Sequence, residues 1–474
     1  MVTRHSLPRG LALGLGLTAL AGGCGDPPPL DHPNVVLVCI DTLRADHVGC
    51  YGYERDTTPW IDSLSAESLV FADACATSSW TRPSVPSFLT GTYPIEHGLY
   101  GLEGQVTHAL SEQALTLAEV FRDHGWRTGA IVRNPQLALG NGFEQGFEVY
   151  RDQSGDAAEI GVRAREWLAS LDGEEPYFLY LHYLDAHWPY PLPDEYATRF
   201  GGAQLEDLWG PDAGLVRDAI NDREQEAVAA ELEQLLALYD GGIRYVDDQL
   251  AAVCAAIGER GDWDDTIVCI VSDHGEEFME HGRIGHGHAL HENLLRVPWI
   301  LRIPGRRGRT VDEPVSLIDV FPTLLAAAGL DAPATDAVNR LADPHAERPV
   351  FAELKELRRY QHSLRRGSRK VVRRYKPKEV PDALGGEESG PLLPRARILD
   401  LILNAPAPGV RLIDLEADPA ERRIHFDDSH TDALEAELDA LARAYARAAR
   451  FEGTAVELDE AALEDLRQLG YTDK

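Results

Sequence analysis

The sequence predicts an α/β fold organised around a central parallel sheet. Three long apolar runs, at residues 34–40, 176–181 and 267–271, alternate with segments of helical periodicity. Uninterrupted apolar runs are typical of strands that helices cover on both faces. Each run also ends abruptly in acidic or histidine residues. Since parallel strands present their carboxyl ends at one edge of a sheet, the sequence predicts a binding crevice at that edge.

The length and charge of the chain limit the classes of protein to be considered. The 474 residues suffice for one large α/β domain with a smaller appendage. The formal net charge of −33 argues against nucleic-acid binding, because such binding depends on lysine and arginine that neutralise phosphates. A solubilised acidic surface is the simplest interpretation of this charge. We therefore expect no nucleic-acid partner, and the composition indicates no particular oligomeric state.

Residues 1–24 have the pattern of a bacterial lipoprotein signal peptide. A positively charged start precedes the apolar run 11–21, which is too short to span a bilayer. Small residues then lead to Cys24, whose thiol would be lipidated after cleavage; an ordinary secretory signal is the alternative. Residues 25–33 contain three consecutive prolines and would form a stiff tether. These features predict a lipid-anchored protein of the bacterial cell envelope, in the periplasm or at the cell surface.

Five cysteines follow the one at the predicted cleavage site. Cys39 and Cys269 lie within apolar runs and are expected to be core thiols. An odd number excludes complete pairing, but a disulfide between Cys50 and Cys75 is possible in an oxidising compartment.

Metal-ligating residues follow two of the three apolar runs. Asp41 comes directly after the first run, and Asp273 with His274 comes after the third, where Gly275 allows a tight turn. Carboxylate oxygen and imidazole nitrogen are both good ligands for divalent metals. Alone, Asp41 could equally cap a helix or form a turn. Together, the three residues favour one shared metal site at the edge of the sheet.

Residues 81–91 have the start and stop signals of a helix. Pro83 suits the first helical turn, and Gly91 suits the C-terminal cap. The hydroxyl of Thr81 would lie near free backbone N–H groups, where an anion is favoured. Close to a metal, that hydroxyl could be an activated nucleophile. The alternative is that Thr81 only caps the helix.

The remaining periodic segments complete the expected large domain. Helices are expected at 113–124, 157–171, 222–258, 318–330 and 430–449. Further strands are expected at 128–132 and 297–303, and the strand of the third apolar run extends over 266–272. We expect Gly241-Gly242 to interrupt the third helix. The second apolar run ends near Asp185 and His187, which makes it a third strand end with an acid and an imidazole.

Four histidines between residues 281 and 291 alternate with glycines, which is typical of an active-site loop. The alternatives are a solvated loop or adventitious metal binding.

Further on, residues 351–378 hold eleven lysines or arginines against two acids, with strand-like valines inside. This basic segment predicts strands of a smaller C-terminal subdomain. It could form a wall toward an anionic substrate or lipid head groups, or a solvated sheet face. The expected boundaries are 34–335 for the catalytic domain and 345–474 for the subdomain.

From about residue 33 to 450, the chain resembles the sulfatase-like branch of the alkaline phosphatase superfamily. The likeness rests on the segments 34–46, 81–94, 272–276, 286–292, 296–298, 304–305 and 412–421. It implies a large mixed β-sheet sandwiched by helices, with a small C-terminal α+β subdomain of an antiparallel sheet plus a helix. It also implies an enzyme that hydrolyses ester bonds.

The resemblance assigns roles to particular residues. The metal ligands would be Asp41, Asp273, His274 and the hydroxyl of Thr81, and Thr81 falls at the position of the nucleophile. The imidazoles of His187 and His286 would bind the ester oxygens or protonate the leaving group. Candidate substrate contacts are Arg82, Arg133, Asn134 and His288.

Two departures from the sulfatase pattern affect the expected chemistry. That pattern begins with cysteine or serine, which is oxidised to formylglycine, and contains an arginine four residues later. Here the positions hold Thr81 and Val85, and Thr42 replaces a second metal-ligating acid. Threonine cannot form that aldehyde. The chain therefore resembles the threonine-nucleophile phosphohydrolases and head-group transferases of the superfamily.

We therefore predict a metal-dependent hydrolase of sulfate or phosphate esters that forms a covalent intermediate on Thr81. Zinc or manganese suits the ligands better than calcium because of His274 and the hydroxyl. A second metal is possible if Asp185, His187 and His286 converge. One alternative is a phosphoethanolamine or glycerophosphate transferase, whose relatives carry several transmembrane helices that are not found here. Another is a catalytically inactive anion-binding lipoprotein, which the retained metal ligands argue against.

Overall fold

The computed structural model describes most of the chain after its first 31 residues. The described residues are 32–101, 106–152, 155–171, 173, 175–202, 213–223, 228–356, 359–375, 395–404, 409–422, 428–449, 451 and 453–469. The predicted signal peptide 1–24, the lipidation site Cys24 and most of the tether 25–33 lie outside these residues. No helix within the described ranges is long and apolar enough to cross a membrane.

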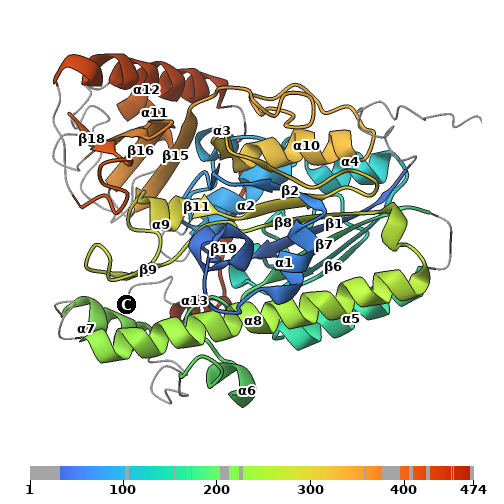
Figure 1. Cartoon of the computed structure of the whole chain (residues 1–474). Coiled ribbons are helices and arrows are strands. Elements are labelled where there is room, and N and C mark those ends of the chain that lie inside the picture. Colours follow the sequence, from blue (N-terminus) through green and yellow to red (C-terminus); the bar gives the residue numbers. More distant parts are fainter. Residues whose placement is uncertain are drawn as a thin grey trace, which may run out of the picture.

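An eight-stranded mixed sheet forms the centre of the large domain (Figure 1). Its order is β13 (Arg309–Val311), β2 (Ser68–Phe71), β12 (Trp299–Arg302), β8 (Thr266–Val271), β1 (Asn34–Ile40), β7 (Tyr177–Tyr183), β5 (Arg127–Val132) and β6 (Val149–Arg151). From β8 to β6 the strands are parallel, whereas β12 runs antiparallel to both of its neighbours. The predicted parallel sheet is confirmed, and the three apolar runs are the adjacent strands β8, β1 and β7.

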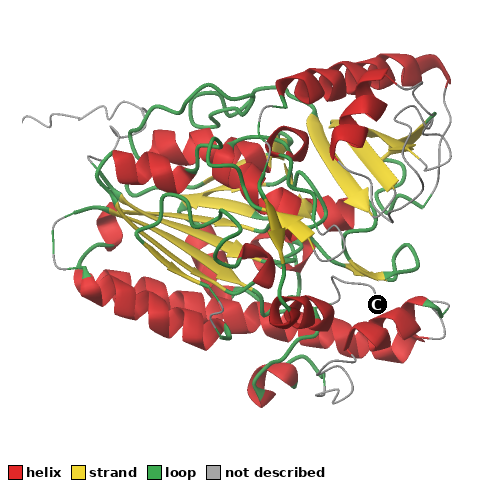
Figure 2. Cartoon of the chain, turned by 180° about the vertical axis from the view of Figure 1, so that it is seen from behind, coloured by secondary structure: helices red, strands yellow, loops and turns green. Residues whose placement is uncertain are grey.

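Helices cover both faces of this sheet (Figure 2). Alternate residues of β1 separate the two cores: Val35 and Leu37 pack on one side, and Val36 and Val38 on the other. The first side is covered by α2 (Thr81–Thr90), α4 (Leu117–Asp123) and α10 (Val320–Ala327). The second is covered by α1 (Pro59–Ser65), α5 (Ala157–Ser170) and α8 (Ala229–Arg260). This two-sided burial explains the uninterrupted apolar sequence of the strands.

Helix α8 is continuous, so the interruption expected at its two glycines is wrong. A Cβ atom at Gly242 would lie 2.1 Å from the carbonyl oxygen of Asp185, and one at Gly241 would lie 2.4 Å from that of Tyr196. The glycines therefore allow the loop after β7 to approach the helix backbone closely. That loop carries the catalytic candidate His187.

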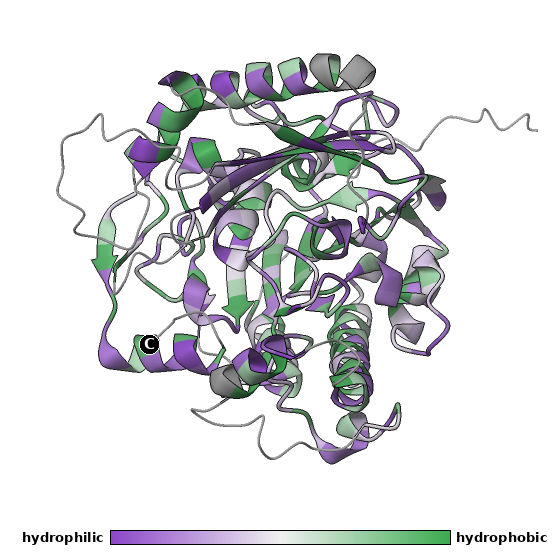
Figure 3. Cartoon of the chain, turned by 90° about the vertical axis from the view of Figure 1, so that its left-hand side faces the viewer, coloured by the Kyte–Doolittle hydropathy of each residue, from purple (hydrophilic) through white to green (hydrophobic). Residues whose placement is uncertain are grey.

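The expected C-terminal subdomain contains a four-stranded antiparallel sheet in the order β15 (Val350–Glu356), β16 (Arg359–Arg366), β17 (Arg369–Tyr375) and β18 (Val410–Asp414). The helices α11 (Arg395–Asn404) and α12 (Asp428–Ala448) pack on it through a third apolar core. Figure 3 shows α12 above this sheet, whose strands carry many hydrophilic residues. The chain then returns to the large domain, because β19 (Ala455–Glu457) pairs with β4 (Val106–His108), and α13 (Glu460–Gln468) follows.

Three basic residues of this small sheet are buried and paired with acids, whereas Arg359 and Arg366 are exposed. Arg365 pairs with Asp73 at 2.6 Å, and the fully buried Arg373 contacts acids of α12 at 2.7 and 3.0 Å. Lys370 is 1% exposed at its side chain and contacts two glutamates. Among the described residues of 351–378, these cations therefore join the small sheet to its surroundings. These three cations do not belong to a solvated face; of the described basic residues in this range, only Arg359 and Arg366 fit that expectation.

The predicted disulfide between Cys50 and Cys75 is wrong, because both thiols are free. Cys75, in β3 (Ala74–Cys75), is buried in the core on one side of the central sheet, whereas Cys50 packs against the core on the other side. The prediction that Cys39 and Cys269 are core thiols is confirmed, since both are at most 1% exposed.

Candidate active site

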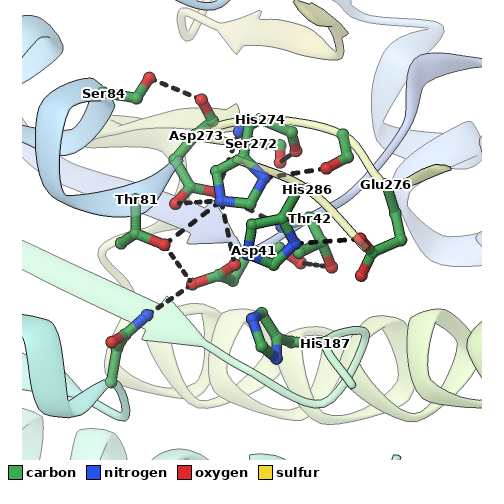
Figure 4. A network of polar contacts seen from close by, with 12 residues as sticks. Asp41, Thr42, Thr81, Ser84, His187, Ser272, Asp273, His274, Glu276 and His286 are labelled. Carbon is green, nitrogen blue, oxygen red and sulfur yellow. Dashed lines mark hydrogen bonds and ion pairs between the residues drawn. The ribbon is translucent and has the colours of Figure 1, made fainter. Parts of the chain in front are cut away.

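The three predicted metal ligands meet at the carboxyl ends of two adjacent strands (Figure 4). Asp41 follows β1, and Asp273 with His274 follows β8 after one residue. All three side chains are fully buried, and one ligand atom from each lies within 4.8 Å of the others. The pairing of β1 with β8 brings them together, although more than 230 residues separate Asp41 from Asp273. The three side chains therefore meet as the sequence predicted, in a group that could hold one metal ion.

The electrostatics of this cluster fit a cation. Among the described residues, neither Asp41 Oδ1 nor Asp273 Oδ2 has a hydrogen-bond partner, although both atoms are buried. Burial and the charge of Asp41 raise the pKa of Asp273 to about 6. Burial alone would raise the pKa of Asp41, but a hydrogen bond with His182 and the charges of His187 and His274 hold it below its ordinary value. A divalent metal between the carboxylates would satisfy the open oxygens and relieve their repulsion.

Thr81 is the first residue of α2, and its hydroxyl faces the ligand cluster. Thr81 Oγ1 lies 3.4 Å from Asp41 Oδ2 and 3.3 Å from His274 Nε2. The N-cap position belongs to Trp80, and no side-chain cap bond is made there. The alternative that Thr81 only caps the helix is therefore not supported. Its hydroxyl lies at a helix N-terminus beside the expected metal, where a nucleophile toward an anionic ester is required.

Of the two residues after β5, Asn134 reaches the centre and Arg133 does not. Asn134 Nδ2 donates a 2.8 Å hydrogen bond to Asp41 Oδ2, and its Oδ1 accepts one from the Gln136 N–H. Arg133 instead binds Asp185 Oδ1 at 2.9 Å. Asn134 thus fixes the orientation of the ligand Asp41, and Arg133 lies on the Asp185 side of the site.

His187 and His286 lie together beside the metal ligands. Their ring centroids are 4.9 Å apart, and the His286 ring lies 4.3 Å from that of His274. Burial lowers the pKa of His187 to about 4 and, with the charge of His274, also lowers the pKa of His286 well below its ordinary value. Both imidazoles are therefore neutral near pH 7. His286 Nδ1 is 2.9 Å from a Glu276 oxygen, and burial raises the pKa of that glutamate to about 7.

Two predicted substrate contacts point elsewhere. Arg82 is one helical position from Thr81, a rotation of about 100°, and its buried guanidinium donates to the backbone oxygens of Gln136 and His108. His288 binds Glu277 Oε2 at 2.9 Å, in a different cluster. Neither residue is therefore a substrate contact in this structure. Arg82 holds the loops around α2, and His288 belongs to the loop that follows Asp273 and His274.

The convergence proposed for a second metal beside the first is also not found. Asp185 is bound by Arg133 and by the backbone N–H of Ala157. Among the described residues, it belongs to no group of three candidate ligands with His187 and His286.

Four further residues shape the site, and the sequence analysis did not assign them roles. His182 Nε2 lies 3.0 Å from Asp41 Oδ2, which follows from the pairing of His182 with Cys39 in adjacent strands. Glu276 positions His286. A carboxylate only three residues after Asp273, close to the same strand end, is the sequence signal for this role. Thr42 has a φ of 61°, and its hydroxyl lies 2.6 and 2.8 Å from the carbonyl oxygens of Asp41 and Ala186.

The fourth residue is a cation at the rim of the site. Arg217, in α7 (Ala213–Asn221), acts electrostatically on both Glu276 and His286. Its side chain also lies against Gly285. No motif marked this arginine in the sequence, because only the tertiary fold brings α7 close to Glu276 and His286.

Comparisons with known proteins identify the family. The family model described as Sulfatase matches residues 33–330. The arylsulfatase of Clostridium perfringens is 25% identical over 384 residues, which cover 65% of this chain and 77% of that protein. The multifunctional alkaline phosphatase superfamily protein PehA of Trinickia caryophylli is 26% identical over 418 residues, which cover 68% of this chain and 78% of that protein.

Solved structures show the same fold. The phosphonate monoester hydrolase of Agrobacterium radiobacter superposes with a TM-score of 0.65 at 19% identity, covering 87% of this chain and 96% of the other. BT4656, solved with its substrate D-glucosamine-2-N,6-O-disulfate, gives a TM-score of 0.67 at 16% identity, covering 88% and 98%. The fold and the site define an ester hydrolase of the alkaline phosphatase type. The chain belongs to the sulfatase family of the alkaline phosphatase superfamily, which confirms the predicted resemblance, fold class and enzyme class.

Proposed function

We propose that the protein hydrolyses anionic phosphate-type esters through a covalent intermediate on Thr81. The observation that carries the proposal is the position of the Thr81 hydroxyl, 3.3 and 3.4 Å from His274 and Asp41 at the start of α2. Threonine cannot become formylglycine, so the usual sulfatase nucleophile cannot form here. A threonine alkoxide suits direct attack at phosphorus. Sulfate esters are the second candidate, because the relatives include an arylsulfatase.

Asp41, Asp273 and His274 would hold one divalent metal, with the Thr81 hydroxyl beside it. Such an ion lowers the pKa of a nearby hydroxyl and neutralises an anionic ester. Zinc or manganese fits the mixed oxygen and nitrogen donors best. Asn134 and His182 hydrogen-bond to Asp41 Oδ2, so that carboxylate keeps its orientation while its Oδ1 faces the metal position.

The reaction proceeds in two displacements. The Thr81 proton passes to solvent, and Thr81 Oγ1 bonds to phosphorus while the bond from phosphorus to the leaving alcohol breaks. The leaving oxygen takes a proton from the pair formed by Glu276 and His286, which holds one proton near neutrality. A water molecule then attacks phosphorus and gives one proton to the same pair, while the bond from phosphorus to Thr81 Oγ1 breaks. The released Thr81 oxygen takes a proton back from solvent, and the phosphate product leaves. Water is thus consumed, and the pair returns to its starting state.

Arg217 and His187 would recognise the rest of the substrate. Arg217 lies near Glu276 and His286 and supplies positive charge on that side of the site. His187, which is neutral near pH 7, can hydrogen-bond to an ester oxygen without a charge. The predicted lipid anchor would place this site outside the cytoplasm, on the envelope side where such esters are met.

The proposal is tested with protein that lacks residues 1–24 and is assayed with zinc, manganese or calcium. The substrates are p-nitrophenyl phosphate, bis-p-nitrophenyl phosphate, p-nitrophenyl phenylphosphonate and p-nitrophenyl sulfate. We expect the highest kcat/KM with one of the phosphorus esters and loss of activity on chelation. A preference for the sulfate would overturn the choice of phosphorus. Absence of all hydrolysis would support the inactive anion-binding alternative.

A further inference from the structure

A second group of candidate metal ligands lies outside the catalytic centre. Glu277 in β9 (Glu277–Phe278) is fully buried, and His281 and His291 converge on it from the following loop. One ligand atom from each lies within 4.8 Å of the others. None of these side chains contacts Asp41, Asp273 or His274 in the described hydrogen bonds and ion pairs. We propose that this group is a second divalent-metal site, with zinc as its natural occupant.

The distances within this group match those of metal ligands better than those of hydrogen bonds. Glu277 Oε2 lies 3.6 Å from His281 Nδ1 and 3.6 Å from His291 Nδ1. In the described part of the chain, neither nitrogen has a hydrogen-bond partner, although both are buried. Two donors that bind a tetrahedral zinc ion at about 2.0–2.2 Å lie roughly 3.4 Å apart. The two distances to Glu277 Oε2 are therefore close to the spacing of zinc ligands.

The hydrogen bonds around the group leave a lone pair directed toward a carboxylate. His281 Nε2 donates to the backbone oxygen of Ala420 at 2.9 Å, so the neutral imidazole carries its proton on Nε2. In this neutral form the Nδ1 lone pair faces Glu277 Oε2 at 3.6 Å, and a metal ion between these two acceptors would satisfy both. Glu277 Oε1 is already held by the backbone N–H groups of His281 and Arg283. His288 holds Oε2 at 2.9 Å and orients the carboxylate, as the hydrogen-bond partners of metal ligands usually do.

The position of the group indicates a structural role. Glu277 directly follows Glu276, which positions His286. On the other side, His281 contacts the segment at Ala420, and Lys370 bridges Glu292 at 2.8 Å and Glu421 at 2.9 Å. A metal bound here would connect the loop that carries Glu276 and His286 to the C-terminal subdomain. Its loss would loosen His286 without removing any ligand of the catalytic metal.

The experiment measures bound metal in the purified full-length protein by inductively coupled plasma mass spectrometry, after saturation with zinc and gel filtration. We expect two equivalents in wild type and in Thr81→Ala. We expect one in His291→Ala, one in Asp273→Asn, and none above background in the double variant His291→Ala with Asp273→Asn. His345→Ala is the matched control, since His345 is an exposed histidine that pairs with Glu313, and it should keep both equivalents.

Cobalt(II) absorption and affinity distinguish loss of a metal ligand from unfolding of the loop. The Asp273→Asn protein should give the visible absorption of tetrahedral cobalt(II), and His281→Ala or His291→Ala should weaken cobalt binding in that background at least about 100-fold. His288→Ala should weaken it about 10-fold, as expected for a residue that orients a ligand. Circular dichroism establishes that each variant is folded. Unchanged stoichiometry in folded His291→Ala, or no metal in folded Asp273→Asn, would overturn the second site. Neither outcome depends on turnover, so the role of Thr81 is tested separately.

Discussion

The catalytic cluster and the cluster around Glu277 contain similar ligands in different settings. In the first, Asp41, Asp273 and His274 stand at the ends of buried strands and are fully buried. In the second, the side chains of His281 and His291 are 16% and 27% exposed and come from a loop. Buried strand ends hold mutually repelling carboxylates in place, whereas a bound metal ion can add stability to a loop. We infer that the first setting serves chemistry and the second serves stability.

The largest expected effect is on turnover at the first cluster. Thr81→Ala should lower kcat by at least about 1,000-fold, because the group that forms the covalent bond is lost. Thr81→Ser keeps the hydroxyl and should retain measurable turnover. Steady-state assays with the preferred ester measure both variants, and metal content shows whether the site is intact. Normal activity in Thr81→Ala would exclude Thr81 as the nucleophile.

A close backbone approach supports the catalytic cluster, and one glycine tests it. Gly242→Ala would force a Cβ atom to within 2.1 Å of the Asp185 oxygen and displace the loop that holds His187. We expect a loss of about 1–3 kcal/mol in the free energy of unfolding and about a 10-fold or larger fall in kcat. Gly258→Ala lies in the same helix with nothing within 4 Å. This control should keep full activity and unfold no more easily than wild type.

The charge of Arg217 should have a smaller effect, on substrate binding. Arg217→Ala should raise KM about 10-fold and change kcat little, since this arginine contacts neither the metal ligands nor Thr81. Arg223→Ala, which removes a salt bridge with Glu231, is the matched control and should leave KM unchanged. Equal KM values for the two variants would exclude Arg217 from substrate binding.

The repulsion at the first cluster predicts an unusual stability response in metal-free protein. The folded-state pKa of Asp273 is raised from 3.8 to about 6, so its protonated form favours the folded state. This contribution is complete below pH 4 and is lost as the pH rises through about 6. Chelated wild type should therefore lose roughly 2–3 kcal/mol from this group between pH 4 and pH 7. Asp273→Asn should lose less and, at pH 8 with chelator, should unfold at a higher temperature.

At the second cluster, loss of a ligand should reduce stability more than turnover. His291→Ala should lower the unfolding temperature of the zinc-loaded protein, while its kcat falls no more than about 10-fold. Thermal unfolding with and without chelator measures the difference. If His291→Ala were as inactive as Thr81→Ala, the second cluster would be part of the chemistry, and the division of roles between the two clusters would be wrong.

The sequence predicted the strand-borne part of the site well. Asp41, Asp273 and His274 were found because uninterrupted apolar runs indicate parallel strands, whose ends meet at one edge. The Thr81 hydroxyl was found because helix start signals are local. The C-terminal subdomain was expected from its basic strands, but the burial of Lys370 depends on acids far away in the sequence.

Side-chain direction was harder to predict than position. Arg82 is adjacent to Thr81, yet the helix turns it toward the loop at Gln136. His288 and His286 are two residues apart and belong to different clusters. The two glycines of α8 predict a break, because glycine disfavours a helix. Their role is instead a close contact with a loop that is distant in the sequence. Arg217 carried no sequence signal, since only the tertiary fold brings it to Glu276.

The role of Thr81 is tested most directly by trapping the intermediate. Wild-type protein is mixed with an excess of the preferred p-nitrophenyl ester, quenched in acid within milliseconds, and digested for peptide mass spectrometry. We predict that the peptide containing Thr81 carries the phosphoryl or sulfuryl group, whose exact mass distinguishes the two, and that Thr81→Ala carries none. Active enzyme with no adduct, or with the adduct on another residue, would contradict nucleophilic catalysis by Thr81.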